Sequence, residues 1–398
     1  MKKRTPPATA STITAAAYET LTPEQRAAYR PIPRKYERLP RVCLVLYGVA
    51  AVCLILLILQ SVSVSFADWF NLRISSHVRG LLAALTAPLP FSLGEAIIWL
   101  LPVALVLTLR HGIRHRCDSW RTSGVFIGIL LSVILTVFSL FVLGFSAGYR
   151  NRTLDRKLGL EQEKITASEL ESTAQWLADS LNREAASASF ARDGFSVMPY
   201  SLAEMNTKLA DAYDDFCAEQ DFIRDNVGRP KPVLLSEGLS YLHITGVYSF
   251  FTGEANININ FPDYTIPYTA AHEMAHQRGI AREDEANMVA FLVCIGSEDP
   301  YIRYSGYLNM YEYVSNALYK ADAARFRAVN NTLETTVRQE LSAYNDFYET
   351  YRDSTVSKVS GTVNNTYLQS QQVPAGTASY GMVVDLTVAW YKVNIDAE

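Results

Sequence analysis

Residues 42–66 contain no charged side chain and consist largely of Val, Leu, Ile and Ala. About 20 apolar residues are needed to cross about 30 Å of hydrocarbon, so this stretch predicts a membrane-spanning helix. Residues 91–109 and the uncharged residues 124–147 are two further candidates. We expect Glu95 to reach the membrane interface from near the end of the second stretch, and Pro102 to kink a packed helix. The first third of the chain therefore predicts an α-helical membrane anchor with three spans.

Charge is divided unevenly along the chain, and it predicts the orientation of these spans. Residues 1–147 carry 15 Lys and Arg against 6 Asp and Glu, whereas residues 148–398 carry 21 against 34. Nine basic residues precede the first span and four lie in the loop 110–121, against two in the loop 67–90. Because cytoplasmic loops are enriched in Lys and Arg, we expect the N-terminus in the cytoplasm and the last part of the chain outside it. Four basic residues directly after the third span weigh against this orientation: Arg150, Arg152, Arg156 and Lys157.

These patterns divide the chain into three parts. Residues 1–41, polar and rich in Pro, predict a disordered cytoplasmic tail that is too long to precede the apolar core of a signal peptide. Residues 42–147 form the three-span region, whose partner is membrane lipid. Residues 148–398 form an acidic extracytoplasmic domain, and we expect no binding to nucleic acid because phosphate contacts need clustered Lys and Arg. Five cysteines do not make a disulfide framework in a chain of 398 residues.

The acidic domain is predicted to be mainly α-helical with a small sheet, an α+β arrangement. Three short runs rich in β-branched and aromatic residues predict strands at 233–235, 244–251 and 255–260. A helix is expected to begin near Tyr268, directly after these strands. Apolar residues at helical spacing predict the other helices, at 166–182, 201–224, 283–295, 301–321, 324–351 and 380–393.

One segment of this domain, residues 270–287, carries a pattern that points to chemistry. His272 and His276 are four residues apart, so they lie one turn apart on one face of a helix. That spacing lets both imidazoles reach one tetrahedral zinc ion at about 2.0–2.1 Å, and Glu273 can hold a water bound to the ion. This is the HExxH pattern of zinc peptidases. The alternative is an amphipathic helix with two ordinary histidines; the carboxylates that follow favour a metal site.

A catalytic zinc site needs three protein ligands and one open position. The third ligand is Glu283 or Glu285. Gly279 can end the first helix in a left-handed conformation, which lets the chain turn back. In the next helix Glu285 points about 160–200° away from Glu283, by helical geometry. We favour Glu283, because it shares a face with small residues that allow close approach, and we expect Asn287 to support a ligand histidine.

The arrangement of these residues resembles known peptidase families. HExxH followed by Glu-x-x-x-Asn is similar to the gluzincins, in which the later Glu is the third ligand, although most gluzincins place it further along the chain. Gly279 is similar to the metzincin pattern, but Arg282 stands where the third metzincin His would be. The departures leave the third ligand less secure than the histidines.

The string from His272 to Asn287 more closely resembles the bacterial membrane family called domain of unknown function 3810. A Phe-Thr-Gly-Glu-Ala-Asn strand at 251–256 and a Ser-Tyr-Gly segment at 379–381 also resemble that family. The resemblance covers most of residues 42–395. It implies a gluzincin-like zinc peptidase without naming a substrate, and it makes Tyr380 a candidate for stabilising the oxyanion.

We therefore expect a membrane-anchored zinc metallopeptidase whose zincin-like domain cleaves a peptide or protein substrate outside the cytoplasmic membrane. Zinc on His272, His276 and Glu283 would polarise the scissile carbonyl and acidify a water, and Glu273 would act as general base. His243 is a second candidate for the oxyanion, from its chemistry.

Other interpretations remain open. The strand 255–260 either offers its edge to an extended peptide or is an ordinary exposed edge. The domain could also be a zinc-containing sensor or peptide-binding receptor of the cell envelope, or a structural module of an envelope complex. Glu273 separates the enzyme from the receptor, since a receptor needs no general base.

Overall fold

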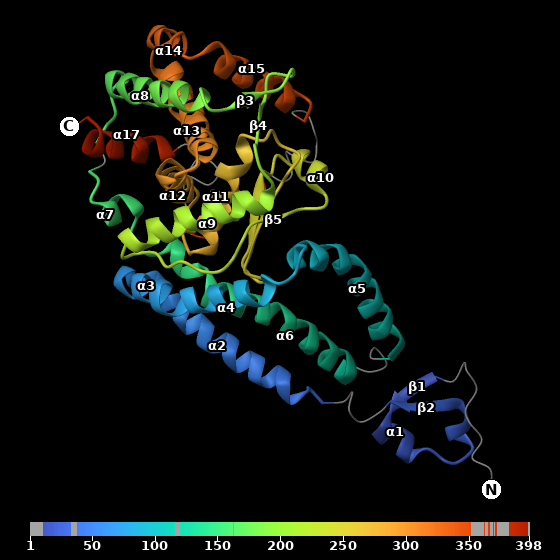
Figure 1. Cartoon of the computed structure of the whole chain (residues 1–398). Coiled ribbons are helices and arrows are strands. Elements are labelled where there is room, and N and C mark those ends of the chain that lie inside the picture. The colour runs from blue at the N-terminus through green and yellow to red at the C-terminus, as the bar shows by residue number, and fades with distance from the viewer. Residues whose placement is uncertain are drawn as a thin grey trace. The chain divides into compact units, whose positions relative to one another are not determined.

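The computed structural model describes residues 11–32, 38–115, 120–161, 163–351 and 382–396, together with residues 362, 365, 366, 369 and 371. The chain forms two compact units. One unit comprises Met1–Leu57 and Glu95–Val142, and the other comprises Ile58–Gly94 and Leu143–Glu398. The first unit contains most of the long apolar helices, and the second contains the predicted chemistry (Figure 1).

Part of the N-terminal tail forms secondary structure, where the sequence predicts disorder. β1 (Ser11–Thr14) and β2 (Tyr29–Ile32) pair in parallel, with α1 (Ala15–Thr20) and the 3-10 helix η1 (Gln25–Ala28) between them. The guanidinium of Arg26 donates to the carbonyl oxygens of Tyr18 and Glu19. Hydrogen bonds of this kind, from a side chain to the backbone, produce no hydrophobic periodicity in the sequence. Apolar spacing therefore does not predict the secondary structure of this tail.

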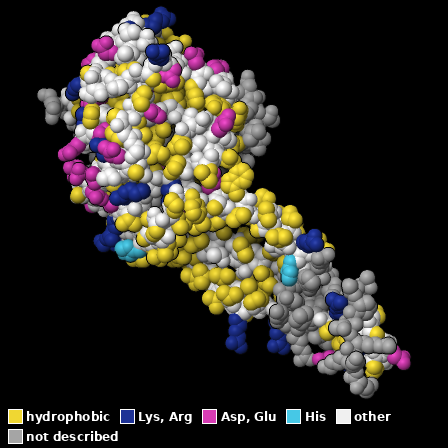
Figure 2. Space-filling view, turned by 45° about the vertical axis from the view of Figure 1, so that its right-hand side comes forward, with side chains coloured by type: hydrophobic (Ala, Val, Ile, Leu, Met, Phe, Trp, Pro, Cys, Tyr) yellow, Lys and Arg dark blue, Asp and Glu magenta, His cyan; other side chains and the backbone are white. Residues whose placement is uncertain are grey.

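Three helices are long and apolar enough to cross a membrane, as the sequence predicts. They are α2 (Arg41–Val62), α5 (Leu93–His115) and α6 (Trp120–Gly144). Most of their large side chains are exposed, as for Val45 at 64% and Leu107 at 61%, and hydrophobic side chains cover their visible surface in Figure 2. The first helix ends before residue 66, because Ser63 accepts a hydrogen bond from the backbone of Phe66 and begins a new helix. These helices are consistent with a membrane protein.

The second unit is mainly helical, as expected, with one small sheet and a short hairpin. Its strands are β3 (Ser189–Phe190), β4 (Ser196–Val197), β5 (Lys231–Pro232), β6 (Gly246–Ser249) and β7 (Glu254–Ile257). Its helices, including the π-helix η3 and the 3-10 helix η4, are α3 (Val64–Phe70), η3 (Asn71–Ser75), α4 (Ser76–Thr86), η4 (Ser146–Tyr149), α7 (Leu154–Leu158), α8 (Ala167–Ala185), α9 (Leu202–Glu219), α10 (Ser236–Ser240), α11 (Thr265–Gln277), α12 (Glu283–Gly296), α13 (Pro300–Ala321), α14 (Ala323–Asn330), α15 (Thr335–Glu349) and α17 (Val383–Asn394).

One predicted helix, 324–351, is two helices in the structure. The hydroxyl of Thr332 donates to the carbonyl oxygen of Val329, in the turn between α14 and α15. Such local bonds from a side chain to the backbone compete with helical hydrogen bonds. The apolar periodicity continues through this turn and gives no sign of it.

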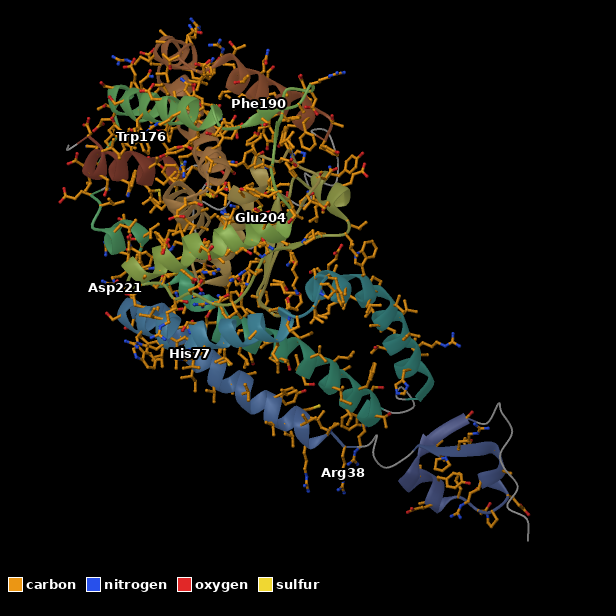
Figure 3. The ribbon with its side chains drawn as sticks, viewed as in Figure 1. Arg38, His77, Trp176, Phe190, Glu204 and Asp221 are labelled. Atoms are coloured by element: carbon orange, nitrogen blue, oxygen red, sulfur yellow. The ribbon has the colours of Figure 1, made fainter. Side chains whose placement is uncertain are left out.

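The core of the second unit forms where α13 packs against α8, α12 and α11. Leu177, Phe291 and Leu308 are completely buried there. Trp176 points from α8 toward α17 (Figure 3), where its ring contacts Trp390. This core holds α11 and α12 in fixed positions, and those two helices carry the HExxH residues and the carboxylates that follow.

The small sheet corrects the expectation for residues 255–260. Its strand order is β5-β7-β6, so β7 is the central strand and not an edge. All four residues of β7 are buried. The amide of Asn256 donates to the carbonyl oxygen of Val247, and that of Asn258 donates to the carbonyl oxygen of Ile244. Asn256 and Asn258 therefore bond to neighbouring backbone instead of facing water, and the edge strands are β5 and β6.

The segment between the first two spans is part of the second unit. Lys231 and Glu254 form a buried ion pair with an Nζ–Oε1 distance of 2.8 Å. Glu254 also accepts from the backbone N–H groups of Leu93 and Gly94, at the start of α5. Lys231 donates to the carbonyl oxygen of Thr86, at the end of α4. A buried, paired charge therefore ties this segment to the sheet.

We predict that the segment 67–90 and the domain 148–398 lie on the same side of the membrane, because they pack in one unit. Cysteines placed at the exposed positions His77 and Glu204 (Figure 3), in a chain without its native cysteines, should react together with a membrane-impermeant thiol reagent on intact cells. A cysteine at Arg121 should react only after permeabilisation. Reaction of positions 77 and 204 from opposite sides would contradict the fold, and inverted labelling of all three would reverse the orientation.

Candidate metal centre

α11 places the HExxH residues inside the second unit. Ala270, Ala271 and Ala275 are completely buried, and α11 packs against β7, β6 and α12. Small side chains at these three positions allow the neighbouring elements to approach closely. The helix that carries His272, Glu273 and His276 is therefore enclosed by packing and does not lie on the surface.

Gly279 ends this helix with a φ of +97°, in the left-handed region, as predicted. The backbone N–H of Ile280 bonds back to the carbonyl oxygen of Ala275. A Cβ at Gly279 would lie 2.2 Å from the guanidinium of Arg79, so both the conformation and the space require glycine. The chain reverses here, and α12 begins at Glu283 beside α11.

The reversal brings His272, His276 and Glu283 together. Their potential ligand atoms all lie within 4.8 Å of one another. One carboxylate oxygen, Oε2 of Glu283, lies 3.3 Å from Nε2 of His272 and 3.4 Å from Nε2 of His276. The three side chains are 12%, 8% and 12% exposed, for His272, His276 and Glu283 respectively.

These separations fit a shared cation better than direct hydrogen bonds. Two ligands at about 2.0–2.1 Å from a tetrahedral zinc ion lie about 3.4 Å apart. A charge-assisted hydrogen bond between imidazolium and carboxylate would be shorter, about 2.7–2.9 Å. The observed 3.3 and 3.4 Å therefore match ligands arranged around an ion.

The orientation of the imidazoles leaves their Nε2 atoms available. Nδ1 of His276 lies 2.7 Å from the carbonyl oxygen of Ile280 and donates its proton there, so Nε2 is the ring nitrogen that faces Glu283. The side chain of Asn287 lies beside His272, as the sequence predicts. Nδ1 of His272 is buried without another partner among the described residues. The amide of Asn287 can accept its proton and fix the same tautomer.

Burial and neighbouring charges shift the pKa values of the four ionisable side chains in this cluster. Burial would lower the pKa of His276, but the Glu283 carboxylate raises it to about 9. Burial raises the pKa of Glu283, but His276 and His272 hold it well below its usual range. Burial lowers the pKa of His272 and raises that of Glu273 to about 8. Oε2 of Glu273 is buried with no hydrogen-bond partner among the described residues.

Glu285, the alternative third ligand, is engaged elsewhere. Its Oε1 accepts from the guanidinium of Arg282 at 2.7 Å and from the backbone N–H of Leu154 at 3.0 Å. Arg282 in turn donates to the carbonyl oxygens of Tyr149 and Asn151. Glu285 therefore holds the start of α12 against the chain that follows the third span, and Glu283 faces the histidines.

A family model described as Protein of unknown function (DUF3810) matches residues 70–388, which is most of the chain. The chain belongs to the DUF3810 family. The match includes α4, α11 and α12, so it covers every ligand candidate of this DUF3810 protein. Searches of curated proteins and of solved structures found no match. The description of the family names no activity and no metal.

The DUF3810 chain also has two residues near the centre that the sequence did not reveal. A Cβ on Gly246 would lie 2.6 Å from Oε1 of Glu273, so β6 passes directly beside this carboxylate. Burial, Glu312 and Glu283 raise the pKa of Tyr313 to about 12, and its hydroxyl lies beside Asn287. Neither position belongs to a local motif; long-range packing brings both to the site.

The two residues considered for the oxyanion are placed differently. Both ring nitrogens of His243 are occupied, Nε2 by the carbonyl oxygen of Tyr351 and Nδ1 by the hydroxyl of Tyr348. His243 therefore has no free nitrogen for a substrate. Tyr380 lies outside the described residues. Among the described residues, Tyr313 is a tyrosine whose pKa is raised by the charge of Glu283 and whose hydroxyl lies beside Asn287.

Replacing Glu283 or Glu285 by Gln separates the two candidate ligands in full-length DUF3810 protein. Glu283→Gln should lose stoichiometric zinc after dialysis, as should His272→Ala, because each removes a ligand. Glu285→Gln should keep zinc but lower the free energy of unfolding by about 1–3 kcal/mol, because it weakens a buried bond to a charged group. Elemental analysis and thermal unfolding provide the measurements. Equal zinc content in the two glutamine variants would rule out the assignment.

Proposed function

We propose that this protein is a membrane-anchored zinc metallopeptidase that hydrolyses peptide bonds outside the cytoplasmic membrane. The observation that carries the proposal is the position of Glu283 Oε2, which lies 3.3 and 3.4 Å from the Nε2 atoms of His272 and His276. Glu273 adds a buried carboxylate directly beside these ligands. Together they make the ligand set and general base of a gluzincin-like, zincin-like site.

The residues of the site divide the chemistry between them. His272, His276 and Glu283 would hold the zinc ion, which supplies a Lewis acid for the carbonyl and for a water. Glu273 accepts the proton of the attacking water and passes it to the leaving amine. Its carboxyl group is buried beside the three ligands, and its Oε1 lies against the start of β6 at Gly246. Tyr313, whose hydroxyl lies beside Asn287, is our candidate donor to the developing oxyanion.

β6 supports a docking site for an extended peptide. It is one of the two edge strands of the sheet, and Val247 in its middle is 46% exposed. A peptide that adds to a sheet edge is held by backbone hydrogen bonds, which suits substrates of varied sequence. Because β6 begins at Gly246, beside Glu273, a peptide paired with this strand would pass the general base. We therefore assign the docking of an extended peptide to β6, and not to the strand 255–260.

The candidate spans support an extracytoplasmic location for the catalytic domain. The distribution of basic residues favours a cytoplasmic N-terminus, and three spans then carry residues 148–398 across the membrane. The segment 67–90 belongs to the same compact unit as that domain, which agrees with an odd number of crossings between the N-terminus and each of them.

A zinc-containing sensor or peptide-binding receptor is the second candidate. The low exposure of the ligand side chains, 12% for His272 and 8% for His276, favours it, because a nearly closed site limits access to a scissile bond. A receptor needs the ligands but has no use for Glu273 as a base.

Glu273→Gln decides between the two candidates. The variant keeps the shape of the side chain and removes its basicity, so zinc content and folding should be unchanged. Cleavage of a peptide library should fall by at least the ~10²–10⁴-fold typical of a lost general base, while peptide binding persists. Glu340→Gln, at a buried carboxylate bonded to Ser196 and Tyr304 in the core, is the matched control and should cleave normally. Native cleavage by Glu273→Gln would refute the mechanism, and binding without cleavage by either form would favour the receptor.

A further inference from the structure

We infer that Asn71 and Arg79, which lie between the first and second spans, are positioning residues for the metal centre. They hold the turn formed by residues 278–280, and that turn orients His276. The inference rests on the proposed metal site and adds a structural connection between that site and the segment that joins the spans. Neither residue belongs to the HExxH motif.

Three consecutive carbonyl oxygens of the 278–280 turn each accept a side-chain hydrogen bond. Arg79 Nη2 donates to the carbonyl oxygen of Arg278 at 3.1 Å, and Asn71 Nδ2 donates to that of Gly279 at 3.1 Å. The third, that of Ile280, accepts from Nδ1 of His276 at 2.7 Å. The same short piece of backbone is therefore fixed by the segment between the spans and fixes a ligand histidine.

Arg79 is the centre of this arrangement. It is only 2% exposed, and its Nη1 donates to Oδ1 of Asn71 at 2.9 Å and to the carbonyl oxygen of Gly144 at 2.7 Å. One guanidinium thus joins η3, the end of α6 and the turn after α11. Burying a charge is costly unless it is bonded, and Nε of Arg79 has no partner among the described residues, so the bonds of Nη1 and Nη2 carry the compensation and the loss of any of them is costly.

The packing leaves the turn no room to adjust. A Cβ at Gly279 would meet the Arg79 guanidinium at 2.2 Å, and a Cβ at Gly148 would meet the carbonyl oxygen of Gly279 at 2.7 Å. The turn is therefore enclosed by α4 on one side and by the chain after the third span on the other. A displaced turn would rotate the imidazole of His276 and shift Glu283, which follows three residues after Ile280.

Partners of this kind affect metal binding measurably. Residues that orient a ligand through a hydrogen bond typically change metal affinity by about 10–100-fold when they are replaced. Asn71 and Arg79 do not contact His276 directly. They act through the backbone of the 278–280 turn, to which His276 donates its hydrogen bond. We expect them to set zinc affinity independently of how strongly they stabilise the fold.

The test uses two amide-to-carboxylate substitutions in the full-length protein in detergent. Asn71→Asp keeps an acceptor for Arg79, which neutralises the new charge, but removes the donor to Gly279. Gln60→Glu is the matched control: Gln60 is 1% exposed and accepts from the hydroxyl of Ser146, and this bond does not involve the 278–280 turn. Asn71→Leu removes the same donor without adding charge. Zinc affinity is measured by competition with a chelator, the coordination geometry by the visible spectrum of bound Co²⁺, and stability by thermal unfolding.

We expect both Asn71 variants to bind zinc about 10–100-fold more weakly than the native chain, with an altered Co²⁺ spectrum. Asn71→Asp should melt near the native temperature, whereas Gln60→Glu should melt lower and bind zinc normally. Native zinc affinity in Asn71→Asp and Asn71→Leu would overturn the inference while leaving the metal site intact. Parallel losses of affinity and stability in all three variants would also overturn it, and absence of zinc from the native chain would instead refute the proposed function.

Discussion

The candidate centre depends on one carboxylate oxygen that approaches two imidazole nitrogens in an interior with little access to water. Such an arrangement is costly without a cation, because burial opposes charge on every member. Burial raises the pKa of Glu273, and the Glu283 carboxylate raises that of His276 against the effect of burial. A divalent ion would offset this cost, because it would take the place of a shared proton and give the lone pair of each ligand atom a partner. The surrounding structure serves to keep these side chains in place.

Two glycines and three alanines make this approach possible. Gly279 lets the chain reverse between α11 and α12, and Gly246 lets β6 lie against Glu273. The buried alanines of α11 allow its neighbours to approach. In each case the absence of side-chain volume allows the close approach, and hydrogen bonds such as those of Asn71 and Arg79 then hold the turn beside His276 in place.

The segment between the first two spans belongs to the domain rather than to a simple connecting loop. Lys231 and Glu254 tie it to the sheet at one end, and Arg79 ties it to the 278–280 turn at the other. The family match also begins in this segment, at residue 70. A peptidase built in this way would have its metal ligands joined by hydrogen bonds to the residues that flank its spans.

The sequence predicts those parts of the structure that depend on local spacing. The three candidate spans follow from long apolar stretches, most helices from apolar periodicity, and the approach of Glu283 from helical geometry after Gly279. It fails where the deciding partner is distant in the chain. The Asn residues of β7 resemble an exposed edge until their bonds to the backbone near residues 244–247 are seen. The role of Arg79 depends on a carbonyl group 199 residues away, and no local pattern records it.

X-ray absorption at the zinc edge of the full-length protein, purified without added metal, tests the central claim most directly. The account predicts one zinc ion per chain with two imidazole nitrogens and oxygen ligands at about 2.0–2.2 Å, and no sulfur. The oxygen shell should include the Glu283 carboxylate and a water. A zinc ion coordinated by sulfur at about 2.3 Å, or a chain that neither retains nor takes up zinc, would contradict it.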